Sequence, residues 1–288
     1  MRGFEFVAPR TVERVLEAIR PRGLNYKLIA GGTNVCPDLR HRTYWPDLVV
    51  DLMRVKALRY VRETKAAIKM GALTTCTDLL ENKLIRRYAP VLCAMAEKFA
   101  GPPIRNRATV AGNIVDASPA ADIAPPLLAL KARVKVRSAR GGRVIPMEEF
   151  FLDYRKVALQ PGELIAEVEF PKVRNMRWGY YKLGRRNAMA ISVVSAAVVL
   201  GMNGKSCREA GISLGAVAPI PLRVRRAEGV LEGERVERAQ AQKAGEEAAA
   251  ASRPIDDIRG SAEYRRLMCE VLTRRLICQA LQIPLEVA

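Results

Sequence analysis

Two short segments rich in glycine and hydroxyl side chains are the parts of this chain best suited to hold a ligand. The first, residues 30–34, reads Ala-Gly-Gly-Thr-Asn and directly follows the apolar run 26–29. The second, residues 109–114, reads Thr-Val-Ala-Gly-Asn-Ile, and Ser-Pro-Ala-Ala-Asp follows it at 118–122. Consecutive N–H groups in a turn form a concavity that binds anions, and glycine allows close approach because it has no Cβ. Together the segments favour binding of a pyrophosphate group.

Plainer structural roles fit the same residues. Residues 30–34 also suit a tight turn between a strand and a loop, and Ser118 and Asp122 also suit a helix-start cap before Pro125. No G-x-G-x-x-G follows a strand and no G-x-x-x-x-G-K-[ST] occurs, so the Rossmann and P-loop interpretations lack their main support.

Metal-ligating residues are few and scattered. The single histidine excludes multi-histidine metal sites and leaves a Ser-His-Asp triad only one possible base. No C-x-x-C pair occurs, so we expect neither a zinc site nor an iron–sulfur cluster built by this chain alone. The residues concerned are His41 and the cysteines Cys36, Cys76, Cys93, Cys207, Cys269 and Cys278.

Composition predicts a globular protein. The 288 residues suffice for two or three modest domains, and 49% are hydrophobic and 27% charged. No apolar stretch reaches the roughly 18 to 20 residues of a membrane span, and no signal-peptide pattern opens the chain. We therefore expect a cytoplasmic protein with no membrane span and with reduced thiols.

The net charge of +18 leaves three interpretations open: a solvated basic surface, a docking face for acidic partners, or nucleic-acid binding. The basic residues are spread through the chain in short pairs such as Arg185-Arg186. They are not interleaved with aromatics, and no zinc-finger or RNA-recognition signature is present. Nucleic-acid binding is therefore not expected.

Periodicity and breaker residues predict the elements of the first 130 residues. Thr11 is a plausible N-cap for a helix that Pro21 and Gly23 end. The predicted strands are 26–29, 47–52 and the pair 58–61 and 67–70; the predicted helices are a short one capped by Thr77 and running to Leu84, 90–99, and one beginning at Pro125.

In the second half, residues 134–136 and 144–145 flank Arg140-Gly141-Gly142 as a hairpin. Residues 164–170 form a predicted strand, and we place a domain boundary at 173–176. The strands predicted beyond it, which form a small antiparallel sheet, are 178–183, 191–200 and 211–217, and the predicted helices are 239–252 and 262–281.

Four motifs in order, at residues 30–34, 109–114, 118–122 and 181–186 (Tyr-Lys-Leu-Gly-Arg-Arg), resemble the FAD-binding medium subunit of molybdenum hydroxylases. That family includes the flavoprotein subunits of carbon monoxide dehydrogenase, xanthine dehydrogenase and 4-hydroxybenzoyl-CoA reductase. The resemblance covers essentially the whole chain. It implies an α+β fold: a vanillyl-alcohol-oxidase (PCMH)-type FAD-binding domain at 1–174, with α/β subdomains at about 1–54 and 55–174. A smaller carbon monoxide dehydrogenase flavoprotein C-terminal domain, with a three-stranded antiparallel sheet and helices, would follow at 175–288.

The resemblance also implies a cofactor and partners. The chain would be the FAD-binding electron-transfer subunit of an oxidoreductase, with no catalytic residue or metal of its own. A small subunit with two [2Fe–2S] clusters and a large subunit with the molybdopterin cofactor would complete a heterotrimer, and two heterotrimers would form a dimer. Electrons would pass through FAD to an external acceptor, which can be NAD, a quinone, ferredoxin or oxygen.

The resemblance assigns roles residue by residue. Residues 31–34 would bind the pyrophosphate, and Thr109, Gly112 and Asn113 would contact the flavin. Ser118 would bond a phosphate or ribose oxygen, and Asp122 the ribose hydroxyls. Ile165 would pack on the ring, and Lys182 would raise the flavin potential from the isoalloxazine carbonyl end. The complete predicted set is Leu28, Ile29, Ala30, Gly31, Gly32, Thr33, Asn34, Val35, Thr109, Gly112, Asn113, Ser118, Ala121, Asp122, Ile165 and Lys182.

Alternatives remain at individual positions and for the whole chain. Lys182 also fits a solvated strand lysine, and Ile165 ordinary core. Asn34 stands where the family often has aspartate, Ala111 where it often has glycine, and Cys36 has no assigned role. The chain lacks the cysteine-rich insertion of some 4-hydroxybenzoyl-CoA reductase subunits. A self-contained flavin oxidoreductase and a basic scaffold protein without flavin are the competing hypotheses.

Overall fold

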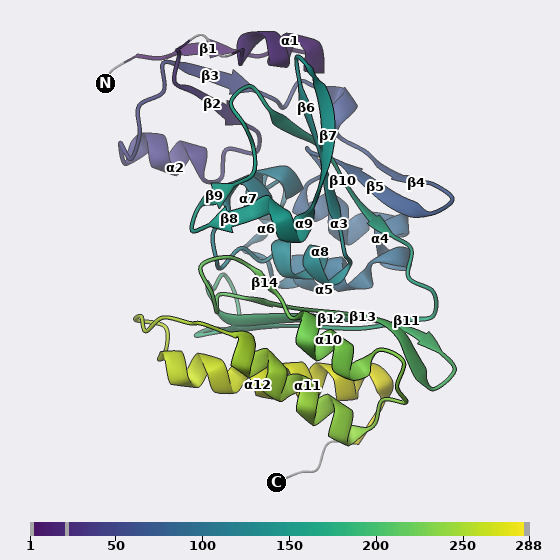
Figure 1. Ribbon diagram of the computed structural model, residues 1–288. Helices are drawn as coiled ribbons and strands as arrows, with labels where there is room; N and C mark the ends of the chain where they lie inside the picture. Colours follow the sequence, from purple (N-terminus) through teal and green to yellow (C-terminus); the bar gives the residue numbers. More distant parts are fainter. Residues whose placement is uncertain (1–2, 21–22, 285–288) are drawn as a thin grey trace.

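The computed structural model describes residues 3–20 and 23–284. Three layered units follow one another along the long axis of the molecule (Figure 1). A small parallel sheet carries the N-terminus, a mixed middle unit follows, and a four-stranded sheet backed by helices forms the other end. None of the helices in the described residues combines the length and apolarity needed to cross a bilayer.

The first unit is a three-stranded parallel sheet in the order β1-β3-β2. Thr11 caps α1 by accepting a hydrogen bond from the Arg14 N–H, and the buried face of α1 packs on the core. The predicted helix and the strands at 26–29 and 47–52 are confirmed; β1 was missed because its short sequence, largely exposed, has no apolar period. The elements are β1 (Glu5–Val7), α1 (Val12–Ala18), β2 (Tyr26–Ile29), α2 (Val35–Arg40) and β3 (Leu48–Asp51).

The middle unit contains a five-stranded antiparallel sheet in the order β4-β5-β10-β6-β7. The hairpin at 134–145 and the strand at 164–170 are confirmed. The bounds predicted for the strand at 58–61 are wrong. Leu58 ends a 3₁₀ turn, η1 (Lys56–Leu58), and the strand that pairs with 67–71 begins only at Val61. The strands are β4 (Val61–Glu63), β5 (Ala67–Gly71), β6 (Arg133–Ser138), β7 (Gly141–Pro146), β10 (Leu164–Pro171) and the small pair β8 (Phe151–Asp153) and β9 (Lys156–Val157).

The helices of the middle unit correct one prediction. The helix expected from Thr77 to Leu84 is two helices. Thr75, and not Thr77, is the N-cap of the first. Asn82 then leaves helical geometry and caps the second. The helix at 90–99 is confirmed to Lys98, and the helix at Pro125 begins one residue earlier. The helices are α3 (Cys76–Glu81), α4 (Lys83–Tyr88), α5 (Pro90–Lys98), α6 (Pro102–Arg105), α7 (Val110–Asp116), α8 (Ala124–Ala129) and α9 (Met147–Phe150).

The C-terminal sheet has the order β11-β12-β13-β14, all antiparallel. The three predicted strands are present, but β13 starts earlier than predicted and the two-residue β14 makes a fourth. Both long C-terminal helices are confirmed, and α10 was missed. The elements are β11 (Met176–Gly184), β12 (Ser192–Asn203), β13 (Ser206–Gly215), β14 (Leu222–Arg223), α10 (Arg225–Leu231), α11 (Arg238–Ala251) and α12 (Ala262–Leu281).

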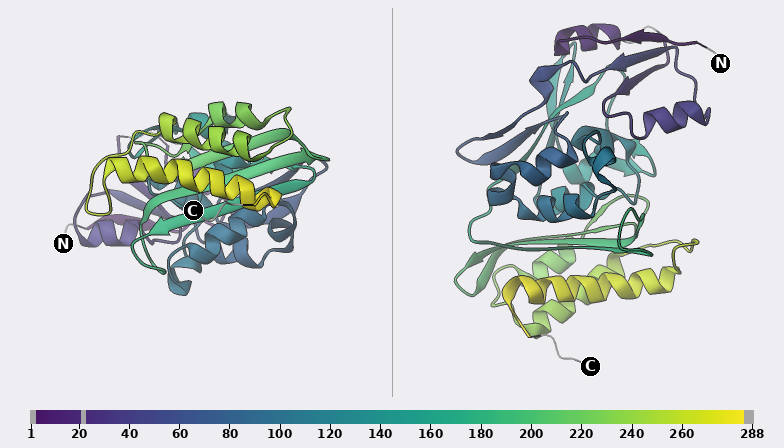
Figure 2. Two further views of the ribbon diagram at one scale, coloured as in Figure 1. Left: turned by 90° about the horizontal axis from the view of Figure 1, so that it is seen from below. Right: turned by 180° about the vertical axis from the view of Figure 1, so that it is seen from behind.

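This sheet lies between two helical layers, with α10, α11 and α12 on one face and α5 and α8 toward the other (Figure 2). The buried strand β12 supplies side chains to both cores in alternation. Ala197 and Val199 belong to the core of the middle unit, whereas Ala196, Val198 and Leu200 belong to the core under the C-terminal helices. The period of two in a strand therefore joins the two cores through one element.

A face of small residues lets α8 pack directly on β13. A Cβ at Gly211 would lie 1.9 Å from the Ala129 carbonyl oxygen, and one at Gly215 would lie 2.9 Å from Pro125 Cγ. Ser213, between them on the same face, donates a hydrogen bond of 2.5 Å to the Pro125 carbonyl. The spacing i, i+2, i+4 thus gives the helix a nearly flat surface, on which the only side chain is the small hydroxymethyl group of Ser213.

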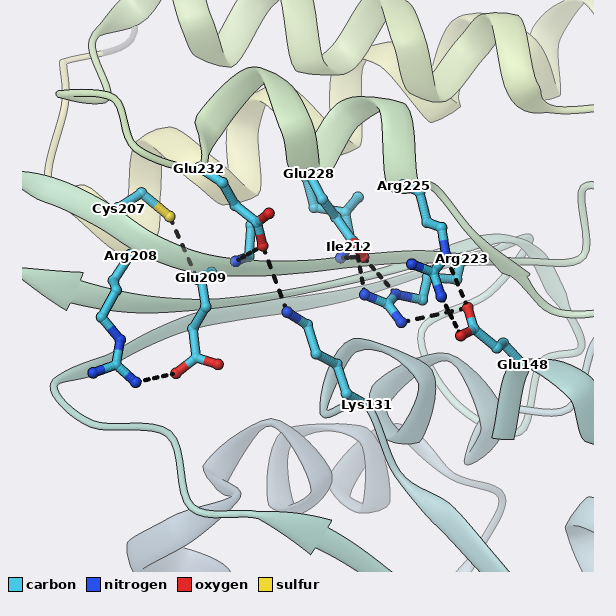
Figure 3. A network of polar contacts seen from close by, with 11 residues as sticks. Lys131, Glu148, Cys207, Arg208, Glu209, Ile212, Arg223, Arg225, Glu228 and Glu232 are labelled. Carbon is cyan, nitrogen blue, oxygen red and sulfur yellow. Dashed lines mark hydrogen bonds and ion pairs between the residues drawn. The ribbon is translucent and has the colours of Figure 1, made fainter. Parts of the chain in front are cut away.

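Ion pairs at one edge connect the same two units (Figure 3). Glu148, from α9, accepts hydrogen bonds from Arg223 and Arg225. Arg223 also forms a bidentate pair with Glu228, whose Oε1 accepts the Ile212 N–H as well. Glu228 is buried, and its hydrogen bonds to Arg223 and Ile212 fix the position of α10 on β13.

Candidate functional site

A cavity of about 250 Å³ opens between the first unit and the middle unit. Its lining residues come from the end of β2, the start of α2, α7, the residues that follow β5 and the start of β10. Its lining includes these members of the predicted set: Leu28, Ala30, Gly31, Gly32, Thr33, Asn34, Val35, Thr109, Gly112, Asn113 and Ile165. The two glycine-bearing segments, far apart in the sequence, therefore face one cavity.

The first segment presents a row of unsatisfied backbone donors. The N–H groups of residues 31–35 donate no hydrogen bond to any acceptor in the described residues, and the Asn34 side chain does not cap α2. Regular pairing resumes at Cys36, whose N–H donates to the Gly32 carbonyl. Five successive free N–H groups beside a cavity form the kind of concavity that holds an anion.

Close backbone approach explains why glycine occupies this turn. A Cβ on Gly31 would lie 1.8 Å from the carbonyl oxygen of Arg107, so any larger residue would push the two segments apart. Gly32 adopts a φ of +76°, in the left-handed region that glycine favours. Arg107 Nε in turn donates to the Gly31 carbonyl at 3.4 Å, which joins the two walls.

The second segment forms the N-terminal turn of α7 rather than a loop. Thr109 Oγ1 accepts the Gly112 N–H at 3.1 Å and so caps the helix. Asn113, on the next turn, lines the cavity, and its side-chain oxygen Oδ1 is buried with no hydrogen-bond partner among residues 3–20 and 23–284. An orphaned buried acceptor costs free energy unless a donor meets it, so Asn113 is placed to accept a hydrogen bond from a ligand.

The remaining cavity wall is apolar. Leu73, Phe99, Ile104 and Leu164 line it beside Ile165. Ile165, predicted to pack on a ring, is almost fully buried and belongs to both the core and the wall. A cavity with polar donors at one end and apolar side chains at the other suits a ligand with a charged part and a ring system.

Residues 72–76 hold the second segment in place. The Val110 N–H donates to the Thr74 carbonyl at 2.9 Å, the Ala111 N–H to Ala72, and the Cys76 N–H to Ala108. Thr75 ends this stretch as the N-cap of α3, in a capping box with Asp78. The position of Thr109 and Gly112 therefore depends on the start of α3.

Asp78→Asn should destabilise the chain by about 1 kcal/mol at neutral pH. Asp78 accepts the Thr75 N–H at 2.8 Å and a bidentate pair from Arg59. Burial alone would raise the pKa of Asp78, but the hydrogen bonds from Arg59 and Thr75 outweigh it and lower the pKa. Solvent screens the half-exposed Arg59, so most of the effect comes from the cap.

Because the folded-state pKa is depressed, this stabilisation is present above the unfolded value of about 3.9 and is lost as pH falls through the lower folded value. Urea unfolding of wild type and Asp78→Asn between pH 2 and 7 measures it. The free-energy difference should shrink below about pH 4. A pH-independent difference, or an equal loss in the exposed control Glu81→Gln, would contradict the assignment.

The other predicted residues lie outside the cavity wall. Ile29 lies behind residues 31–35, which we call the cradle, and its Cδ1 would be 3.4 Å from a Cβ at Gly32. Ser118 is half-buried, and its hydroxyl accepts the Ala120 N–H. Ala121 is buried beside Asp122.

Asp122 and Lys182 form a buried ion pair. Lys182 Nζ donates to Asp122 Oδ2 at 2.6 Å, and the Ser192 hydroxyl donates to Oδ1 at 2.8 Å. Burial raises the pKa of the Asp122 carboxyl, while Lys182 and Ser192 act in the opposite direction. The nearby Tyr180 hydroxyl is buried and has no hydrogen-bond partner in the part of the chain that the structure describes, and burial raises its pKa well above the usual value. Lys182 is thus a paired buried lysine and not a solvated one.

Sequence reasoning missed several lining residues. Lys27, Asp38 and Asp116 bring charges to the rim, and Ala72, Leu73 and Leu164 bring apolar surface. Leu73 follows the predicted strand 67–70 and Leu164 begins the predicted strand 164–170, so their position at a strand end was the available signal. Phe99 and Ile104 flank the Gly-Pro-Pro segment at 101–103, and no motif in the sequence includes them.

The cysteines show no arrangement for metal binding. Within residues 3–20 and 23–284, no group of three or more His, Cys, Asp or Glu side chains is close enough to hold a metal ion. Burial raises the pKa of Cys76 and of Cys269 to about 12 in each case, which makes both inert thiols. Cys36 is exposed, directly behind Gly32.

The fold and the site define a flavin-binding class of protein, and comparisons with known proteins agree. Residues 2–173 match the family described as the FAD binding domain in molybdopterin dehydrogenase. Residues 179–280 match the carbon monoxide dehydrogenase flavoprotein C-terminal domain. The chain belongs to this family, the FAD-binding medium subunits of molybdopterin-dependent dehydrogenases and hydroxylases.

Individual relatives are similar over nearly their whole length. The carbon monoxide dehydrogenase medium chain of Hydrogenophaga pseudoflava is 29% identical, over 95% of this chain and 96% of the relative. The xanthine dehydrogenase FAD-binding subunit of Escherichia coli O157:H7 is 30% identical, over 96% and 97%. A carbon monoxide dehydrogenase structure from H. pseudoflava superimposes with a TM-score of 0.91 at 29% identity, covering 98% of both chains. Quinoline 2-oxidoreductase from Pseudomonas putida 86 gives a TM-score of 0.90 at 27% identity, also with 98% coverage of both chains.

These comparisons confirm the α+β fold, with an FAD-binding domain followed by a smaller domain built on an antiparallel sheet. The chain is therefore an oxidoreductase subunit. The residues present fit FAD: free N–H groups suit a pyrophosphate, the orphaned Asn113 oxygen suits a ring or ribose donor, and the apolar wall suits a flavin ring.

Proposed function

We propose that this chain is the FAD-binding electron-transfer subunit of a heteromeric molybdenum hydroxylase. A small partner subunit would supply electrons from two [2Fe–2S] clusters, a large partner would carry the molybdopterin cofactor, and an external acceptor would remove the electrons. The observation that carries the proposal is the row of N–H groups at residues 31–35 without acceptors among the described residues, which the close contact between Gly31 and Arg107 holds beside the cavity.

Each wall of the cavity has a separate task in this proposal. Residues 31–35 bind the pyrophosphate through backbone donors, so their contribution does not depend on side-chain charge. Asn113 orients the flavin by accepting a hydrogen bond at Oδ1, and Leu73, Phe99 and Ile165 exclude water from the ring. When bound, FAD supplies the chemistry, which is to accept electrons from one partner and release them to another.

Further assignments rest on the family resemblance. Ser118, Ala121, Asp122 and Lys182 would contact the parts of FAD that extend beyond the cavity wall. The proposed domains are 1–174, in subdomains of about 1–54 and 55–174, and 175–288. We propose a cytoplasmic dimer of heterotrimers. The names of two relatives, a "medium chain" and a "complex subunit alpha", refer to assemblies of those proteins and support a multisubunit complex here.

The decisive experiment is to express the chain together with the products of its neighbouring genes and to record visible spectra before and after dithionite. We expect flavin bands that bleach on reduction, with iron–sulfur absorbance only when partners copurify. Substrate-dependent flavin reduction by the isolated chain would favour a self-contained oxidoreductase. A folded, FAD-supplemented sample that takes up no flavin would disprove the proposal.

A further inference from the structure

The charged side chains that line the cavity are by themselves a poor match for a pyrophosphate. Among the described residues, the lining includes two carboxylates, Asp38 and Asp116, and one cation, Lys27. The Lys27 ammonium lies over the Tyr44 ring, 4.8 Å from its centroid. The pyrophosphate of a dinucleotide is an anion, so both carboxylates repel it and weaken its binding. A cation close to Asp38 and Asp116 would offset this repulsion.

Arg155, in the turn between β8 and β9, lies at this position. Its N–H donates to the Ala117 carbonyl at the end of α7 at 3.3 Å, and its Nη1 donates to Asp116 Oδ1 at 3.4 Å. The β8–β9 hairpin therefore lies beside α7 (Figure 1). These two contacts hold the Arg155 guanidinium next to a residue of the cavity lining.

The same guanidinium also interacts with the segment that contains the cradle. A hydrogen bond with Tyr154 and the charges of Asp116 and Asp38 raise the pKa of Arg155. Asp38 lies in α2, shortly after the cradle, and its N–H donates to the Asn34 carbonyl at 3.0 Å. Arg155 thus interacts with carboxylates from both α7 and α2, the two helices that carry the glycine-bearing segments.

The ion pair between Arg155 and Asp116 is of a kind that a better acceptor can replace. It joins one guanidinium nitrogen to one carboxylate oxygen at 3.4 Å, and the Arg155 side chain is 51% exposed. Exposed pairs of this kind contribute little to stability. A phosphate group offers arginine two parallel acceptors and forms a stronger, bidentate contact. Asp116 therefore keeps Arg155 beside the cradle without binding it tightly.

We propose that Arg155 is a binding residue for the pyrophosphate of FAD, which it reaches by exchanging Asp116 for the phosphate oxygens. This inference rests on the proposed function, because it needs FAD in the cavity. The backbone donors of the cradle carry no net charge, so Arg155 supplies the charge that offsets Asp38 and Asp116. These two carboxylates in turn limit how tightly the site holds the cofactor.

The test uses the full chain, freed of flavin and in the complex with which it purifies, and FAD as the probe. Quenching of flavin fluorescence gives the dissociation constant at several salt concentrations. Arg155→Gln should weaken FAD binding about tenfold and make it less dependent on salt, because one charge-assisted contact is lost. Arg155→Lys keeps the charge and should recover part of the affinity.

A second variant should act in the opposite direction. Asp116→Asn removes a negative charge beside the phosphates and releases Arg155, so it should strengthen FAD binding about threefold at low salt. If the ion pair only held the hairpin in place, both Asp116→Asn and Arg155→Gln would bind FAD more weakly. The opposite signs therefore separate phosphate binding from a structural role.

The matched control is Arg226→Gln, which alters an exposed arginine paired with Glu247 in the C-terminal unit and should bind FAD like wild type. Unchanged FAD affinity in Arg155→Gln, or weaker FAD binding in Asp116→Asn, would overturn the assignment of Arg155. A folded wild-type chain that does not bind FAD would instead refute the proposed function, so the two failures are distinguishable.

Discussion

Replacing Gly31 with alanine should weaken FAD binding about a hundredfold, or about 2.7 kcal/mol. The new Cβ would lie 1.8 Å from the Arg107 carbonyl oxygen, so residues 30–34 must move away from the second wall. Displacing the cradle removes two or more charge-assisted hydrogen bonds to the pyrophosphate, each contributing about 1.5 kcal/mol or more. Quenching of flavin fluorescence on titration with FAD measures the dissociation constant.

A second variant separates lost binding from lost folding. Thr33→Val keeps the volume of the side chain but removes the hydroxyl, and it should cost about tenfold in FAD affinity. Gly229→Ala, at a position in α10 with no atom within 4 Å of the new Cβ, is the matched control and should bind FAD like wild type. Full FAD affinity in a folded Gly31→Ala chain would rule out the cradle.

The largest loss of stability is expected for Gly211→Ala, at about 3 kcal/mol. The added methyl group would lie 1.9 Å from the Ala129 carbonyl oxygen, and the neighbouring atoms are helix backbone that cannot turn aside. α8 must therefore lift from β13, which strains the hydrogen bond between Ser213 and Pro125. Thermal and urea unfolding in the absence of FAD measure the effect.

In the same assays Gly229→Ala should be neutral or stabilising by up to about 1 kcal/mol, because alanine is the better helix former and the site is open. If Gly211→Ala unfolded at the same urea concentration as Gly229→Ala, the close contact between α8 and β13 would be wrong.

Local signals in the sequence predicted most of the fold. Thr11, Pro90 and Pro125 marked helix starts, and the alternation in 164–170 marked a strand, because caps and periods act within a few residues. The errors came where a tertiary contact determines the bounds of a helix or strand. The N-cap of α3 is Thr75, which pairs with Thr109 in a β-bridge that no local sequence pattern indicates.

The two halves of the candidate site differed in how far they could be predicted. The glycine segments were identified because their residue types are unusual, and the structure brings both to one cavity. The hydrogen bonds from residues 72–76 that position α7, and the apolar wall with Leu73 and Phe99, were missed since these residues look like ordinary core. The burial of Lys182 against Asp122 depends on a contact across 60 residues of sequence.

Because the side chains of β12 alternate between the two cores, the boundary between the two family matches does not separate two independent cores. Ala197 and Val199 complete the core of the middle unit, although they lie within the C-terminal match. A chain cut near Val173 would lose the apolar sheet that covers α5 and α8, and an isolated C-terminal fragment would expose the face of that sheet that carries Ala197 and Val199. The two halves therefore share one sheet, and each half keeps water from apolar side chains of the other.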